Sequence, residues 1–210
     1  RSGAARGRIL LLMVTLTLTG CASQKPTPPT QSQAPGLTRA QADDAADTLW
    51  QDYRESDEGQ RLLIMHAFNQ ITHADDTMPI HVELRWDTDT PKPDAGVPVY
   101  ISMHGGGAFT ELENEDQWDI QKTRYPGVRG LYICPHSPMD TWDQWHNEAI
   151  FPLIETLVRA VFLQDEVDNN RIYLSGYCSG GNGVYQLGPI LADHFAAVSA
   201  TKALSNGAPL

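Results

Sequence analysis

The sequence has few of the residues that disulfide-rich and metal-dependent proteins need. Only three cysteines occur among its 210 residues, and no two of them form a C-x-x-C pair. An odd number of widely spaced cysteines excludes a disulfide framework and a cysteine zinc cluster. An H-x-x-x-H pair is also missing, so the histidines give no support to a catalytic metal. We expect no metal and no cofactor.

Positive charge is scarce as well. The chain has 15 lysines and arginines against 26 aspartates and glutamates, and its formal net charge is -11. An acidic chain repels phosphate backbones, so we expect no nucleic-acid partner. Residues 9–19 form an apolar and threonine run of 11 residues, short of the roughly 20 that a membrane-spanning helix needs. A transmembrane helix is therefore not expected there.

The N-terminus instead has the pattern of an export signal. Basic Arg1, Arg6 and Arg8 precede the apolar run, which ends in Leu18-Thr19-Gly20-Cys21. This ending resembles a bacterial lipobox, which implies cleavage before Cys21 and lipidation of that residue. We expect an exported lipoprotein, periplasmic or on the cell surface, anchored to the membrane through Cys21. A plain secretory signal with an incidental cysteine is the alternative.

Composition divides the chain into segments with different expected structures. Residues 1–20 are the predicted signal peptide, and 21–36 are the lipidated cysteine and a disordered linker rich in proline, serine, threonine and glutamine. Residues 37–77 are predicted as an N-terminal helical segment, in which Thr38 caps a helix to about Glu55 and 61–71 fits helix or strand.

Residues 78–210 are predicted as a partial α/β domain. Apolar patterning predicts strands and helices in alternation. The strands are 80–86, 97–103, 131–134, 171–174 and 196–200, and the helices are 115–124, 147–164 and 179–193. Such alternation indicates a mostly parallel sheet flanked by helices.

A glycine-rich turn joins one of these strands to the helix after it. It reads Gly176-Tyr177-Cys178-Ser179-Gly180-Gly181. Glycines two positions before and after Cys178 allow the sharp, strained turn of a nucleophile elbow, which holds its central side chain exposed. Ser179 is the alternative nucleophile, but Tyr177 would crowd the turn around it. An ordinary strand-to-helix turn is the other interpretation.

A second glycine motif, His104-Gly105-Gly106-Gly107, follows the buried strand 97–103. Glycines at this point let the backbone approach a substrate closely. The two motifs, in this order, resemble the α/β-hydrolase superfamily over about residues 78–200. Within it they are similar to secreted esterases of the polyhydroxybutyrate depolymerase and feruloyl esterase type and to peptidase-like hydrolases. The elbow cysteine is similar to that of dienelactone hydrolases, and chemistry on an enol-lactone stays open.

The resemblance implies a hydrolase of carboxylic esters, with peptides as a second substrate class and a small ester or acyl compound as its partner. Cys178 matches the nucleophile. The backbone amides of Ser179 and of Gly106 or Gly107 match the oxyanion hole. His104 is expected to shape its loop at the site rather than to act as a base.

Aromatic and polar side chains follow the strand at 131–134, near the carboxyl edge where open α/β sheets bind ligands. These side chains are His136, Trp142, Trp145 and His146. Together with His104 and Trp118 they form the predicted substrate-binding set. The alternative is that the tryptophans anchor a long loop to the core. We expect Cys134 to be a core residue without a disulfide to Cys178, because their strands would lie about 10 Å apart across the sheet.

The resemblance also implies an acid and a histidine base that follow the nucleophile. Only Asp193 and His194 do so here, at the far end of a predicted helix about 21 Å long, so they cannot reach Cys178. We expect the triad acid and histidine, and the last strands of the sheet, beyond Leu210. The competing hypothesis is a non-catalytic lipoprotein that uses the same cleft to bind a ligand or partner.

Overall fold

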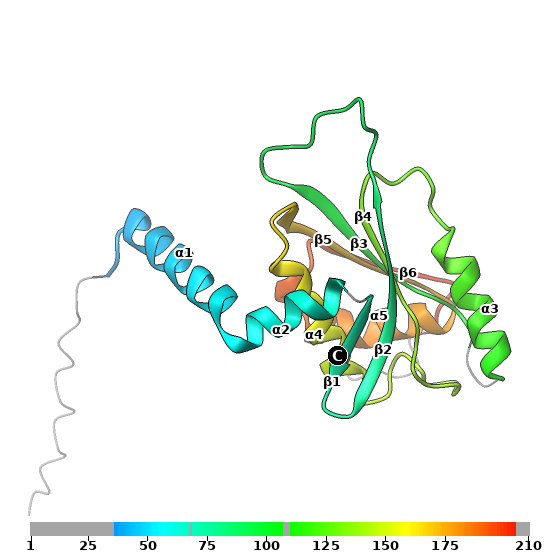
Figure 1. Cartoon of the computed structure of the whole chain (residues 1–210). Helices are drawn as coiled ribbons and strands as arrows, with labels where there is room; N and C mark the ends of the chain where they lie inside the picture. The colour runs from blue at the N-terminus through cyan, green and yellow to red at the C-terminus, as the bar shows by residue number, and fades with distance from the viewer. Residues whose placement is uncertain (1–35, 68, 107–109, 205–210) are drawn as a thin grey trace, which may run out of the picture.

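The computed structural model describes residues 36–67, 69–106 and 110–204, and it places six strands in one mixed sheet (Figure 1). The strands lie in the order β1-β2-β4-β3-β5-β6. They are β1 (Gln70–His73), β2 (Asp76–Arg85), β3 (Val97–Met103), β4 (Gly130–Pro135), β5 (Val167–Tyr177) and β6 (Ala197–Thr201). The helices are α1 (Arg39–Glu55), α2 (Asp57–Ala67), α3 (Glu111–Lys122), α4 (Ile150–Phe162) and α5 (Ser179–Ile190), followed by the 3₁₀ turn η1 (Ala192–His194).

Strand direction follows from the connections. The tight turn between β1 and β2 makes that pair antiparallel, and β2 also runs antiparallel to β4. Helical crossovers make β4, β3, β5 and β6 parallel to one another. The predicted α/β architecture, a mostly parallel sheet flanked by helices, is confirmed.

The central strand β3 is covered on both faces, as its continuous apolar sequence predicts. Val99, Ile101 and Met103 join the main core cluster, to which α4 contributes most of its side chains. On the other face, the hydroxyl of Ser102 accepts a hydrogen bond from the Gln121 amide of α3, at 2.7 Å. Figure 1 shows α3 on one side of the sheet and α4 and α5 on the other.

The N-terminal helices are arranged differently from the prediction. Thr38 caps α1 in a capping box with Gln41, as expected, but no residue of α1 is buried. The ambiguous segment 61–71 contains both the end of α2 and the start of β1. β1 and the first residues of β2, which fall within the predicted helical segment 37–77, belong to the sheet.

Several predicted boundaries were wrong, three of them for reasons visible in the structure. α3 begins at Glu111, because Thr110 and Glu113 form a capping box upstream of the predicted start. Asn169 and Asn170 lie inside β5, and the chain turns before them at 165–166. α5 ends at Ile190 instead of Asp193. None of the helices within the described residues is long and apolar enough to cross a membrane.

Candidate functional site

Cys178 lies alone between the end of β5 and the start of α5. Its backbone has φ 55° and ψ -117°, a conformation that an L-residue rarely adopts. The amide of Cys178 is held by a hydrogen bond to the Thr201 carbonyl of β6, at 2.9 Å. The residue is exposed. The predicted strand, sharp turn and helix are therefore present, with the thiol at the apex.

The two glycines flanking Cys178 are required by close backbone packing. A Cβ on Gly176 would lie 2.1 Å from the Gly180 carbonyl oxygen. A Cβ on Gly180 would lie 2.4 Å from the carbonyl oxygen of Met103, at the end of β3. Both separations are far below van der Waals contact, so the spacing Gly-x-Cys-x-Gly follows from the packing of this turn.

Ser179, the alternative nucleophile, is oriented inward. It is the first residue of α5 and only 4% exposed. Its hydroxyl oxygen accepts a hydrogen bond from the Gln144 side-chain amide at 2.7 Å. Of the two candidates, only Cys178 faces solvent.

The glycine loop after β3 lies against the elbow. A Cβ on Gly105 would be 3.3 Å from the Cβ of Cys178 and 3.2 Å from the Tyr177 ring. Gly106 has φ +96°, which favours glycine. Gly107, the other residue predicted to supply an oxyanion amide, lies outside the described residues. The Ser179 amide is one of the first four N–H groups of α5, which have no partner within the helix.

His104 is buried and fully engaged at the base of this loop. Its Nδ1 donates to the Gly105 carbonyl at 2.7 Å, and its Nε2 accepts from the Ser137 amide at 3.1 Å. These bonds require the neutral ring, and burial lowers the pKa of His104 to about 4. We infer that His104 shapes the loop, since neither nitrogen is left to act as a base.

Gln144 is the main residue that sequence reasoning missed. It is fully buried, and its Nε2 donates to the Gly105 carbonyl at 3.2 Å as well as to the Ser179 hydroxyl. One side chain therefore joins the glycine loop to the elbow. No motif surrounds this glutamine in the sequence, and its burial depends on contacts that the local pattern does not record.

Trp145, predicted to contact substrate, is also completely buried. Its indole N–H donates to the His104 carbonyl at 2.8 Å, and its ring meets the His104 ring edge-on at 5.0 Å. A Cβ on Gly183 of α5 would lie 2.5 Å from the Trp145 Cβ. These contacts fit the alternative interpretation, in which this tryptophan anchors the loop to the core.

Trp118 and His136 lie beside His104. Trp118 is half-buried, and its indole N–H donates to the Cys134 carbonyl at 2.9 Å. The ring of His136 stacks on His104 at 5.5 Å and lies 4.7 Å from the Trp118 ring. Burial lowers the pKa of His136, while the nearby carboxylate of Glu115 opposes the shift. These three rings form one cluster behind the glycine loop.

Trp142 and His146 form a separate pair. Trp142 is 59% exposed, and its ring meets His146 edge-on at 4.8 Å. Both ring nitrogens of His146 are enclosed and have no hydrogen-bond partner among the described residues. The predicted substrate-binding set thus divides into the buried His104 and Trp145, the half-buried Trp118 and His136, and this outer pair.

The cysteines agree with the sequence analysis. Cys134 lies on β4 and Cys178 directly follows β5, and β3 separates these two strands. Both described cysteines are free. Cys134 is buried, and burial raises the pKa of its thiol. His194 lies in η1, beyond α5, where its ring contacts Phe162 at 5.6 Å. Among the histidines whose side chains the structure describes, none hydrogen-bonds to Cys178, and the described side chains contain no cluster of His, Cys, Asp and Glu suited to a metal.

The sequence matches no family model and no curated protein. Solved structures with a similar fold include Est1E from Butyrivibrio proteoclasticus, at 17% identity and a TM-score of 0.45 over 64% of this chain and 50% of that one. The BES protein from Bacillus cereus is similar at 17% identity and a TM-score of 0.44, over 66% and 62% of the two chains. A thermostable esterase is similar at 22% identity and a TM-score of 0.44, over 61% and 39%. The chain spans about half the length of Est1E.

Proposed function

We propose that this chain is part of an exported hydrolase of carboxylic esters, with peptides as a second substrate class. The observation that supports it is the exposed Cys178, in a strained backbone conformation between Gly176 and Gly180. The glycine loop packed against it supports the same proposal, because nucleophile and oxyanion donors must lie side by side for acyl transfer.

In the proposed reaction the sulfur of Cys178 attacks the carbonyl carbon of the ester. A thioester forms, the bond to the alkoxy group breaks, and the alcohol leaves with the thiol proton. Water then attacks the thioester, releasing the carboxylic acid and returning the proton to the thiol. The amides of Ser179 and Gly106 would stabilise the oxyanion in both steps, an effect worth about 3 kcal/mol per donor in other enzymes.

The proposal also requires a histidine base and an orienting acid. The interactions of the described histidines provide neither at Cys178, and His104 is already fully engaged. We expect slow acylation from these residues alone, with efficient turnover depending on a base supplied from outside them.

Acylation with p-nitrophenyl acetate tests the proposal directly. The wild-type chain should release p-nitrophenol in a burst and carry one acetyl group on the peptide that contains Cys178, detected by mass spectrometry. Cys134→Ala should behave in the same way, because that thiol is buried. Cys178→Ala should lose both signals; equal acetylation in wild type and Cys178→Ala would reject the nucleophile.

The alternative, a ligand-binding lipoprotein without catalysis, predicts a different result. A correctly folded wild-type chain would then show no burst and no acetylated cysteine. It would still bind ester-like compounds, with binding changed by substitution at the exposed Trp142. The acylation assay therefore separates the two functions.

Export and membrane anchoring are part of the proposal and depend on residues 1–35, which lie outside the described residues. Their support is the basic start, the apolar run and the lipobox-like ending at Cys21. Expression in a bacterial host with labelled palmitate should place label in the wild-type protein and not in Cys21→Ala. Label retained by Cys21→Ala would exclude lipidation at this cysteine.

A further inference from the structure

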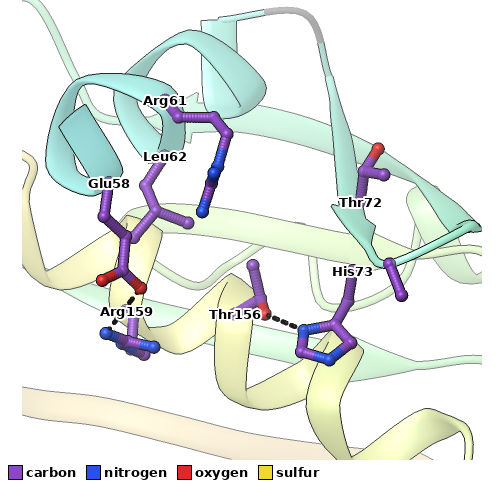
Figure 2. Close-up of a pocket in the computed structure, with 8 residues that line it drawn as sticks. Glu58, Arg61, Leu62, Thr72, His73, Thr156 and Arg159 are labelled. Carbon is purple, nitrogen blue, oxygen red and sulfur yellow. Dashed lines mark hydrogen bonds and ion pairs between the residues drawn. The ribbon is translucent and has the colours of Figure 1, made fainter.

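A second cavity, with a volume of about 380 Å³, lies between α2, the turn from β1 to β2, and α4 (Figure 2). None of the residues that line it belongs to the elbow or to the glycine loop. It is within the size range of small-ligand pockets. Its occupant can therefore be considered independently of the proposed hydrolase function.

Positive groups dominate this cavity, although the whole chain is acidic. Its lining includes two guanidinium groups, Arg61 and Arg159, and a single carboxylate, Glu58. Leu62, which is 2% exposed, contributes apolar surface to the lining. A cavity with two cations and one anion attracts small anions, while the net charge of -11 disfavours large polyanions such as nucleic acids.

The two arginines have different surroundings. Arg159 is held in place by an ion pair with Glu58, 2.8 Å between Nη2 and Oε1, and its guanidinium lies 5.5 Å from the Tyr53 ring centre. Arg61 extends from α2 into the cavity (Figure 2). No carboxylate of the described residues forms an ion pair with Arg61. Its five N–H donors are thus available to a ligand.

The opposite wall is formed by His73 and Thr156. The Thr156 hydroxyl donates to the Pro152 carbonyl at 2.6 Å, so it can only accept from His73 Nδ1, 3.4 Å away. This wall is polar and carries no negative charge. An anion facing Arg61 would meet no repulsive group there.

We propose that this cavity binds a small phosphate-bearing anion, either inorganic phosphate or a phosphomonoester, with Arg61 as the main ligand and Arg159 as the second. The planar guanidinium forms paired, charge-assisted hydrogen bonds with phosphate oxygens. Glu58 orients Arg159 but also competes with the anion for it.

Titration calorimetry of the full chain with sodium phosphate and with glycerol 3-phosphate, in chloride buffer, tests this proposal. Both anions should bind to wild type, and Arg61→Gln should weaken binding about tenfold or more, as expected for a charge-assisted hydrogen bond. Glu58→Gln should strengthen binding severalfold, since it removes the competing charge. Arg129→Gln is the matched control, because Arg129 is exposed and pairs only loosely with Asp87, at 3.8 Å.

Three results would overturn the proposal. They are no heat of binding for either anion in wild type, equal affinities in wild type and Arg61→Gln, and weaker binding in Glu58→Gln. Circular dichroism of each variant identifies any loss of folding, and the Glu58→Gln gain cannot arise from unfolding. None of these outcomes depends on ester hydrolysis, so the anion site and the proposed function can fail separately.

Discussion

The side-chain nitrogen of Gln144 lies 2.7 Å from the hydroxyl oxygen of Ser179. The same nitrogen donates to the Gly105 carbonyl, whose oxygen also accepts from His104. Gln144 thereby holds the loop after β3 at a set position relative to the first turn of α5. The candidate oxyanion donors lie on these two segments, so their spacing depends on this residue.

Replacement of Gln144 by leucine should lower the free energy of unfolding by about 1–2 kcal/mol, because it removes both hydrogen bonds at a buried position. The Gly105 carbonyl keeps its bond from His104, which limits the loss. Urea unfolding measures the change. Gln51→Leu, on the exposed face of α1, is the control and should stay within about 0.5 kcal/mol of wild type. Equal values for the two variants would show that Gln144 does not stabilise the loop.

Substitution of Gly180 by alanine should destabilise the protein by about 1–3 kcal/mol or more. The added Cβ would meet the Met103 and His104 carbonyl oxygens at 2.4 and 2.6 Å, and neither backbone segment can move without disturbing the sheet. Gly127→Ala is the matched control, since its Cβ would have no neighbour within 4 Å. Thermal unfolding of both variants provides the measurement, and a stable Gly180→Ala protein would contradict the described turn.

The two described thiols should differ in reactivity. Iodoacetamide should modify Cys178 at least about tenfold faster than Cys134, because Cys178 is exposed while burial raises the pKa of the Cys134 thiol and blocks access. Peptide mass mapping after timed alkylation of the native protein gives both rates. In urea the difference should disappear. Comparable rates in the native protein would place Cys134 at the surface instead.

Acidification should destabilise the protein through His104. Its folded pKa is about 4, below the ordinary 6.5, so the unfolded chain binds more protons between these values and stability falls as the pH decreases from 6.5 to 4. The full contribution of this group is about 3 kcal/mol. Urea unfolding at several pH values measures the slope.

His104→Gln should flatten this slope between pH 6.5 and 4, because the variant has no ring to protonate. His194→Gln, in the η1 turn outside the core, is the control and should keep the wild-type slope. A His104→Gln slope equal to that of wild type would assign the acid sensitivity to other groups. His136 is one such group, since it stacks on His104 and burial also lowers its pKa.

Much of the fold is predictable because its signals are local. The apolar run 97–103 and the helical spacing after residue 147 correspond to β3 and α4, and Thr38 caps α1 as its sequence indicates. Boundaries were harder to predict. The strand β5 extends back to Val167 because its first residues pair with β3 at Val97, a contact between segments 70 residues apart in sequence. Local pattern cannot reveal such a partner.

The candidate site is only partly predictable from the sequence, because local motifs are visible in it and contacts between distant segments are not. The motif around Cys178 identified the turn, since the glycines are needed within a few residues of one another. The sequence predicts one substrate-binding set for the aromatic residues near it, yet Trp145 is buried and Trp142 is exposed. No local pattern indicates that Gln144 belongs to the site. Each of these outcomes depends on how the loop at 136–149 folds back onto the sheet.

The alternation of strands and helices and the glycine spacing around Cys178 can be recognised without a structure, because periodicity and turn chemistry are properties of neighbouring residues. The acidic character of the chain follows from its composition. Which side chains are enclosed depends instead on contacts between distant parts of the chain. Trp145 meets the His104 carbonyl across 41 positions of sequence, and Arg159 of α4 meets Glu58 of α2 across a larger separation. Such contacts form when the sheet brings distant segments together. They determine which side chains are buried and hydrogen-bonded, and they position both the elbow at Cys178 and the walls of the cavity at Arg61.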